Sequence, residues 1–259
     1  MEKYTLITGA SIGIGYEMAK ILASMKYNLI IVARNEEKLE EIKTDFEATY
    51  GIIVKVFAKD LSVKGNAQQL FNNVKSNTLQ VEMLINNAGV GNYGQFIETS
   101  LYEELNMIEL NISSLVTLTK LFAQDMVKNK SGKILNVASL LSYLPFPYYS
   151  VYSATKTFVL AFSETVNAEL EGTGVLVKAL CPGPINTAFT KPKMATTNAY
   201  KTNKPVSPEF VAKEGIEFLL NNKTIKIVGF NNWFISNLPR ITPDFIMMKI
   251  KKNLASQIK

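Results

Sequence analysis

Thr8-Gly9-Ala10-Ser11-Ile12-Gly13-Ile14-Gly15 follows an apolar run at residues 4–7 and opens a helical pattern near 14–25. Glycines in a turn between a strand and a helix let backbone amides approach a pyrophosphate, and the start of the helix favours its negative charge. The spacing departs from G-x-G-x-x-G, because Met18 stands where the last glycine is expected. This stretch therefore predicts a dinucleotide site, with a plain turn that binds no ligand as the alternative.

Short apolar runs alternate with longer amphipathic stretches along the rest of the chain. The runs lie at 4–7, 28–32, 52–57, 83–85, 133–137, 175–180 and 224–228, and helical patterns lie near 14–25, 36–49, 64–76, 101–128, 151–171 and 208–221. This alternation is typical of a parallel sheet covered by helices on both faces. We predict a single α/β domain, residues 1–259, with a sheet of about seven strands.

The composition excludes several kinds of site. The chain has no histidine, which removes Ser-His-Asp and Cys-His catalysis and zinc sites that need imidazole, and no metal site is predicted. The single Cys181 permits no internal disulfide, and we expect it to be a small buried apolar residue. No uncharged apolar segment reaches the roughly 18 residues that span a bilayer, and no secretory pattern is found, so we expect a cytoplasmic protein.

A basic residue ends the second predicted strand. Ala33-Arg34-Asn35 contains no acid, and Arg34 lies 19 residues after Gly15. In dinucleotide-binding folds an acid at this point binds the ribose 2′-hydroxyl, whereas a base accommodates a 2′-phosphate. We therefore predict NADP(H) as the cofactor, with Ser11 as a second phosphate contact; a solvated arginine at the strand end is the alternative.

Tyr152 and Lys156 lie one helical turn apart, and Ser139 stands thirteen residues before the tyrosine. The chain has two other Tyr-x-x-x-Lys pairs, at 16–20 and 200–204, but neither has a serine at that distance. The i, i+4 spacing places the lysine ammonium beside the phenol, and a nearby cation favours phenolate. We therefore predict a pKa for Tyr152 below the ordinary value of about 10.

This set of side chains suits a hydride-transfer reaction. We predict that Tyr152 protonates a carbonyl oxygen while hydride reaches the carbonyl carbon, and that Ser139 holds that oxygen. Ser142 is a less suitable partner, since it falls three residues farther from the strand. We expect Ser153 and Thr155 to be surface or helix-start residues.

These residues and several others, in the same order, resemble the classical short-chain dehydrogenase/reductase family over nearly the whole chain. The matching segments are Thr8 to Gly15 for TGxxxGxG, Asp60-Leu61, Asn86-Asn87-Ala88-Gly89 for NNAG, the tetrad Asn111, Ser139, Tyr152 and Lys156, and residues 182–187. The resemblance implies a doubly wound Rossmann-type fold, a nicotinamide cofactor and a homodimer or homotetramer. Taken singly, the NNAG segment could be a bare turn, Asp60 a helix cap and Asn111 a helix kink.

The resemblance also assigns roles to individual residues. It implies that Lys156 holds the nicotinamide ribose and that Asn111 positions a water that connects Lys156 to solvent. The implied cofactor contacts are Thr8, Gly9, Ser11, Ile12, Gly13, Ile14, Gly15, Asp60, Leu61, Asn87, Ala88, Gly89, Tyr152, Lys156, Pro182, Gly183, Ile185 and Thr187.

Apolar and aromatic residues surround the predicted carbonyl site. The candidate substrate contacts are Leu141, Tyr143, Phe146, Tyr149, Tyr93 and Phe189. A long acyl, steroid-like or aromatic carbonyl compound fits them, although core packing or a subunit contact explains the same composition equally well. Residues 183–206, rich in Pro, Thr, Asn and Lys, predict a mobile substrate loop.

The positive charge lies in the last quarter of the chain. Residues 1–190 have 16 basic and 18 acidic side chains, whereas residues 191–259 have 12 and 4. In the extension 239–259, Ile246, Ile250, Leu254 and Ile258 recur every four residues, which indicates a basic amphipathic helix. Docking on the protein body or on a partner subunit is favoured over contact with an anionic membrane surface. No nucleic-acid motif accompanies the charge, so no nucleic-acid partner is expected.

We therefore predict an NADPH-dependent oxidoreductase that reduces a ketone or aldehyde group of an apolar substrate. A non-catalytic NADP-binding regulatory or partner protein of the same fold is the main alternative, but it would not need all four tetrad residues. A hydrolase that uses Ser139 would have to take Lys156 as its base, because histidine is absent.

Overall fold

The computed structural model describes residues 2–187, 189 and 192–257, and these form one seven-stranded sheet. Its order is β3-β2-β1-β4-β5-β6-β7, and every pairing is parallel. The strands are β1 (Lys3–Thr8), β2 (Asn28–Ala33), β3 (Val54–Ala58), β4 (Gln80–Asn86), β5 (Gly132–Val137), β6 (Val175–Cys181) and β7 (Ile225–Ile227). The predicted doubly wound α/β fold is confirmed.

Helices connect the strands and extend the chain beyond β7. They are α1 (Gly13–Ser24), α2 (Glu36–Tyr50), α3 (Asn66–Ser76), α4 (Leu101–Ile108), α5 (Leu115–Lys128), α6 (Ser150–Glu169), α7 (Pro192–Ala195), α8 (Asn198–Thr202), α9 (Pro208–Leu220), α10 (Phe230–Asn237) and α11 (Asp244–Ala255). Three shorter turns are η1 (Glu109–Ser114), η2 (Leu140–Ser142) and η3 (Leu238–Arg240). Within the described ranges, no helix has the length and apolar character needed to cross a bilayer.

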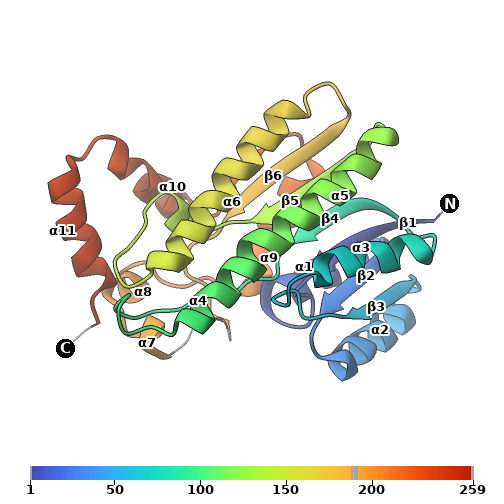
Figure 1. Cartoon of the computed structure of the whole chain (residues 1–259), viewed down its shortest axis with the longest axis horizontal. Helices are drawn as coiled ribbons and strands as arrows, with labels where there is room; N and C mark the ends of the chain where they lie inside the picture. Colours follow the sequence, from blue (N-terminus) through green and yellow to red (C-terminus); the bar gives the residue numbers. More distant parts are fainter. Residues whose placement is uncertain (1, 188, 190–191, 258–259) are drawn as a thin grey trace.

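Helices cover both faces of the sheet, with α1, α2 and α9 on one face and α3, α5 and α6 on the other (Figure 1). Strand β2 shows why. Leu29 and Ile31 join the core on the α1, α2 and α9 side, while Ile30 joins the core on the α3 and α5 side. All three are fully buried, as a strand with two covered faces requires.

The connections reverse direction beside β1. The chain passes outward from β1 through β2 to β3, and then returns to place β4 on the other side of β1. The loops that leave the carboxyl ends of β1 and β4 therefore diverge, and such a switch point is where open α/β sheets bind ligands.

The predicted loop 183–206 contains regular structure where it is described. Thr197 caps α8 by accepting a hydrogen bond from the Tyr200 amide at 3.3 Å. The end of α11 holds the same segment, because Asn198 donates from its backbone to the Ser256 carbonyl at 3.0 Å and from its side chain to the Asn253 carbonyl at 2.9 Å. Residues 188, 190 and 191 lie outside the described part, and the mobility of the loop stays a prediction.

The tail helix α11 docks on the protein body. Met247 and Ala255 are buried in a cluster with Leu144 and Phe146. Of the predicted stripe, Leu254 packs against this cluster, whereas Ile246 and Ile250 are each 41% exposed and Ile258 lies outside the described residues. The prediction that this stripe forms the buried face of the helix was therefore only partly right. Met247, and not Ile246, packs in the cluster with Leu144 and Phe146.

Candidate active site

The glycine-rich turn has a backbone shape that depends on its glycines. Gly9 and Gly13 have φ angles of 66° and 60°, in the left-handed region that favours glycine. The Gly9 amide donates to the Val32 carbonyl at 2.8 Å, which fixes the turn to the end of β2. A Cβ at Gly15 would collide with the backbone of Gly9, so only glycine lets α1 begin this close to the turn.

Two polar residues attach the turn to the end of β4. The Thr8 hydroxyl accepts from the amides of Asn87 and Ala88, both at 3.0 Å. The Asn87 side chain in turn donates to the carbonyls of Thr8 at 3.0 Å and Gly9 at 3.2 Å. Thr8 and Asn87 therefore hold the two diverging loops in a fixed relation.

A continuous cavity of about 1220 Å³ runs along the carboxyl ends of the strands. Thr8 and Gly15 do not line the cavity, but they hold residues that do, since Thr8 bonds to the Asn87 amide and Gly15 packs against Gly9. The other predicted cofactor residues all line it, namely Gly9, Ser11, Ile12, Gly13, Ile14, Arg34, Asp60, Leu61, Asn87, Ala88, Gly89, Tyr152, Lys156, Pro182, Gly183, Ile185 and Thr187. Residues from six distant segments of the sequence thus meet around one space.

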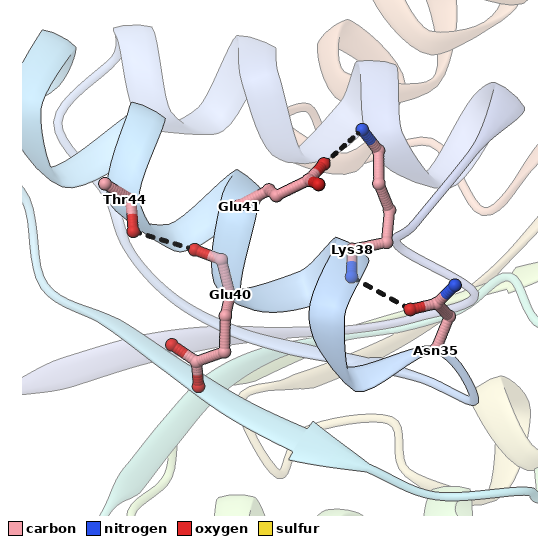
Figure 2. A network of polar contacts seen from close by, with 5 residues as sticks. All are labelled: Asn35, Lys38, Glu40, Glu41 and Thr44. Atoms are coloured by element: carbon pink, nitrogen blue, oxygen red, sulfur yellow. Dashed lines mark hydrogen bonds and ion pairs between the residues drawn. The ribbon is translucent and has the colours of Figure 1, made fainter.

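Arg34 lies exposed where the cavity meets the end of β2. The neighbouring Asn35 caps α2 by accepting from the Lys38 amide at 2.9 Å, and the Lys38 side chain pairs with Glu41 at 2.7 Å (Figure 2). None of the salt bridges found in the described residues includes Arg34. The guanidinium is therefore free to bind an anion inside the cavity.

Asp60 contributes a carboxylate at the same end. Burial disfavours its charge, but hydrogen bonds from the Ser62 amide at 2.9 Å and hydroxyl at 2.7 Å, together with the charge of Arg34, hold the pKa of Asp60 below its ordinary value. The turn at Asp60 thus keeps an ionised acceptor beside a cation.

Tyr152 and Ser139 are hydrogen-bonded partners in the middle of the cavity. Loss of solvent around the phenol raises the pKa of Tyr152 to about 12, and the bond with Ser139 opposes that rise. The predicted lowering by Lys156 is therefore not found in this structure. The phenol is protonated at neutral pH, which is the form that donates a proton.

Lys156 directs its ammonium to the end of β5, where Nζ donates to the Val137 carbonyl at 2.8 Å. Its side chain is buried, and this burial lowers the pKa of Lys156 to about 8. A Cβ at Gly89 would lie 3.4 Å from Nζ and 3.2 Å from the Asn111 Oδ1 atom. The lysine and the asparagine therefore flank the same glycine of the segment after β4.

Asn111 lies in the π-helical turn η1, which interrupts the helix predicted over 101–128. Its side chain accepts from the Val90 amide at 3.0 Å and donates to the Val90 carbonyl at 2.9 Å and the Thr155 hydroxyl at 3.1 Å. Asn111 thus joins η1, the loop after β4 and helix α6. Its predicted role in positioning water stays a prediction.

Two residues that the sequence suggested were peripheral are buried. Thr155 and Ser153 are each only 1% exposed, so they are not surface residues, although both lie near the start of α6, as the other half of the prediction had it. Thr155 accepts from Asn111, and Ser153 accepts from the Phe146 amide at 3.4 Å. Ser142 donates to the Lys156 carbonyl at 2.7 Å and does not line the cavity, which leaves Ser139 as the serine beside Tyr152.

The apolar end of the cavity includes four of the six candidate substrate residues. Leu141, Phe146, Tyr149 and Phe189 line it, and the Phe189 ring lies 5.7 Å from the ring of Tyr152. Two candidates lie elsewhere. Tyr143 packs on a core cluster behind η2, and Tyr93 donates its hydroxyl to the Ala255 carbonyl at 2.8 Å. Both stabilise the surrounding structure and do not line the space.

Sequence reasoning missed the rest of this wall. It includes Met194, Thr197, Ala199, Tyr200, Phe230, Phe234, Ile235, Leu238 and Met247, with Ile250 and Leu254 from the predicted stripe. These residues come from α7, α8, α10, η3 and α11. No local motif marks them, because their role depends on how the tail folds back.

The polar half of the cavity fits a phosphorylated dinucleotide. The start of α1 offers backbone amides to a pyrophosphate, Arg34 offers a cation for a further phosphate, and Lys156 lies at the far end. Thr187 lies close to Gly13 at the edge of the cavity, since a Cβ on that glycine would be 3.5 Å from the Thr187 side chain. Such a ligand would extend from Arg34 to Tyr152.

Comparison with known proteins agrees with this geometry. The profile of the short chain dehydrogenase family matches residues 3–198. The chain is 33% identical over 226 residues to 17-beta-hydroxysteroid dehydrogenase type 3 of Mus musculus, which covers 85% of this chain and 70% of that protein. It is 32% identical over 267 residues to the very-long-chain 3-oxoacyl-CoA reductase of Phaeosphaeria nodorum, with 99% and 77% covered.

A solved structure shares the same arrangement. A short-chain dehydrogenase from Sphingobium yanoikuyae in complex with NADPH superimposes with a TM-score of 0.79 at 25% identity, over 92% of this chain and 93% of that one. Together with the profile match and the identity to curated relatives, this shows that the chain is an oxidoreductase of the short-chain dehydrogenase/reductase family.

Proposed function

We propose that the protein uses NADPH to reduce a ketone or aldehyde group on an apolar substrate to an alcohol. The observation that carries this proposal is the position of the Tyr152 and Ser139 pair, with Lys156, between a phosphate-suited and an apolar half of one cavity. A carbonyl carbon placed there would lie within reach of both a cofactor in the polar half and a proton donor.

The protein's own residues supply the proton and the orientation. NADPH, when bound, supplies hydride to the carbonyl carbon. Ser139 positions the carbonyl oxygen, and Tyr152, protonated because its pKa is about 12, donates to that oxygen as negative charge develops. Lys156 lines the same cavity and does not lower the pKa of the resting phenol, but in this proposal its charged ammonium stabilises the phenolate that forms during the reaction.

The preference for NADPH over NADH rests on Arg34. Its guanidinium lines the cavity at the end of β2, where a 2′-phosphate would lie, and no acidic residue occupies that position. The NADPH complex of the relative from Sphingobium yanoikuyae supports the same choice. Ser11, which also lines the cavity, is the second phosphate contact in this proposal.

The substrate class follows from the apolar wall. Leu141, Phe146, Tyr149 and Phe189 enclose the space beyond Tyr152, and the tail helices extend it. Relatives named for hydroxysteroid and very-long-chain 3-oxoacyl-CoA substrates support an extended apolar carbonyl compound. The reactive carbonyl would face Ser139, and the apolar remainder would lie against α10 and α11.

The proposal is tested by the loss of NADPH absorbance with a panel of aldehydes and ketones of increasing apolar size. We expect turnover with the larger members and a falling KM as the apolar portion lengthens. A chain that binds NADPH tightly and consumes none with any member would be the non-catalytic NADP-binding protein instead. Ester cleavage without cofactor would indicate the hydrolase.

A homo-oligomer is also part of the proposal. Leu101, Tyr102 and Leu105 of α4 are more than half exposed, and Phe158 of α6 is 39% exposed. Helices α4 and α6 pack side by side, so these residues form a surface that a second copy can bury. Light scattering of the purified chain tests the expected dimer or tetramer. The cytoplasmic location stays a prediction.

A further inference from the structure

A second group of exposed apolar residues lies on the carboxyl-terminal helices. We call it the tail surface. It consists of exposed side chains on α10, α11 and the turn between them, namely Phe230, Trp233, Phe234, Ile241, Phe245, Ile246, Met248 and Ile250. The six most exposed range from 52% to 81%. Large apolar side chains gathered in this way mark an interaction site.

Basic residues accompany the tail surface. Between residues 230 and 257 the chain has four cations, at Arg240, Lys249, Lys251 and Lys252, and one acid, Asp244. Lys249 and Lys252 are exposed on the same helix as Phe245 and Met248. The surface therefore carries a net positive charge, which attracts an anionic partner.

The tail surface is continuous with the substrate end of the cavity. Phe230, Phe234 and Ile250 line the cavity and are also 78%, 58% and 41% exposed. The cavity therefore reaches the exterior between α10 and α11, which lie together at one end of the molecule (Figure 1).

We propose that the tail surface docks on an anionic lipid bilayer, so that the cavity opens toward the membrane interface. Aromatic and aliphatic side chains flanked by lysines suit the boundary between head groups and acyl chains. A second copy of the chain fits less well, because symmetric pairing would bring equal positive charges together. Docking itself goes beyond the reductase activity, whereas the entry route for substrate rests on the proposed function.

Trp233 reports docking directly, because it is the chain's single tryptophan and is 52% exposed. The full chain, with NADP bound, is mixed with vesicles of phosphatidylcholine alone or of phosphatidylcholine with phosphatidylglycerol. We expect a shift of Trp233 fluorescence to shorter wavelength and co-sedimentation with the anionic vesicles, both weakened by added salt. Unchanged fluorescence and no co-sedimentation with anionic vesicles at low salt would overturn the proposal.

Paired variants locate the contact. Phe245→Ser with Met248→Ser removes two exposed apolar side chains that do not line the cavity. The matched control is Met25→Ser with Val63→Ser, at exposed positions far from the tail. We expect vesicle binding to fall about tenfold or more in the tail variant, and to stay unchanged in the control. Equal binding by both variants would contradict the proposal.

A charge variant and a mass measurement complete the test. Lys249→Glu with Lys252→Glu is expected to abolish the preference for anionic vesicles, while Lys64→Glu with Lys120→Glu, both exposed elsewhere, is expected to keep it. A vesicle-free mass that falls from oligomer to monomer in the Phe245 and Met248 variant would mean that a second copy covers the surface, against the proposal. NADPH consumption is measured separately, so either proposal can fail alone.

Discussion

The two ends of the cavity are built differently. The cofactor end consists of backbone turns at the ends of adjacent strands, joined by the hydrogen bonds of Thr8 and Asn87. The substrate end consists of side chains on short helices, held to the tail by a few bonds such as those of Asn198. In our proposal the first end therefore selects the cofactor, whereas the second end selects the substrate.

The largest expected effect comes from the junction between the two ends. Ser139→Ala removes the hydroxyl beside Tyr152, and we expect kcat to fall about 10²–10³-fold, as for loss of one oxyanion donor. NADPH affinity should stay near that of the original protein. The matched control is Ser142→Ala, whose hydroxyl contacts the Lys156 carbonyl outside the cavity. Similar losses of kcat in both variants would mean that Ser139 has no special role.

At the cofactor end, Arg34→Asp replaces the cation near the expected 2′-phosphate with a carboxylate. Loss of a charge-assisted hydrogen bond of about 1.5–3 kcal/mol should weaken NADPH binding about 10- to 100-fold and favour NADH relative to NADPH. Cofactor titrations measure both affinities. Arg240→Asp, at the only other arginine, serves as the control. An unchanged ratio of the two affinities in Arg34→Asp would refute the assignment.

The pH dependence tests Lys156 between the two ends. Its pKa is lowered to about 8, so the ammonium is present below that pH and is lost above it, whereas Tyr152 stays protonated up to about 12. The value of kcat/KM for reduction should therefore be level below pH 8 and fall by up to tenfold per pH unit above it. Lys156→Arg, which stays charged, should be slower but should lack this break. If kcat/KM of the arginine variant still fell above pH 8, the titrating group would be a residue other than Lys156.

The smallest effect is expected at the substrate end. Phe189→Ala removes a half-buried ring beside Tyr152, and KM for an apolar ketone should rise about three- to tenfold. The affinity for NADPH should not change. Phe96→Ala removes an exposed ring outside this cavity and provides the control. A large loss of NADPH affinity in Phe189→Ala would contradict the assignment of Phe189 to the substrate end.

The sequence predicted the cofactor end well, because its features are local. A left-handed glycine, a buried strand and an arginine at a strand end each leave a pattern within a few residues, as Gly9, Ile30 and Arg34 illustrate. The spacing of thirteen residues between Ser139 and Tyr152 then predicted that both act at one site. Their meeting follows from the parallel sheet, which brings strand ends to one edge.

The rest depended on tertiary packing that leaves no such pattern. Tyr143 and Phe146 are neighbours in an aromatic run, yet only Phe146 lines the cavity. Burial of Thr155 follows from the π-helical turn that presents Asn111 to it, and the pKa of Tyr152 is set by desolvation that spacing cannot measure. The part of the cavity wall that α10 and α11 supply depends on the packing of Met247 in one cluster with Leu144.

The most direct measurement follows the transferred atom. An apolar ketone is reduced with NADPH that carries deuterium at both hydrogen positions of the nicotinamide C4 atom, and the alcohol is analysed by mass spectrometry for the original protein and for Tyr152→Phe. The account predicts one deuterium on the carbinol carbon for each NADPH consumed, and a rate about 10²–10⁴-fold lower in the variant with NADPH affinity retained. Unlabelled alcohol, or equal rates in the two proteins, would contradict it.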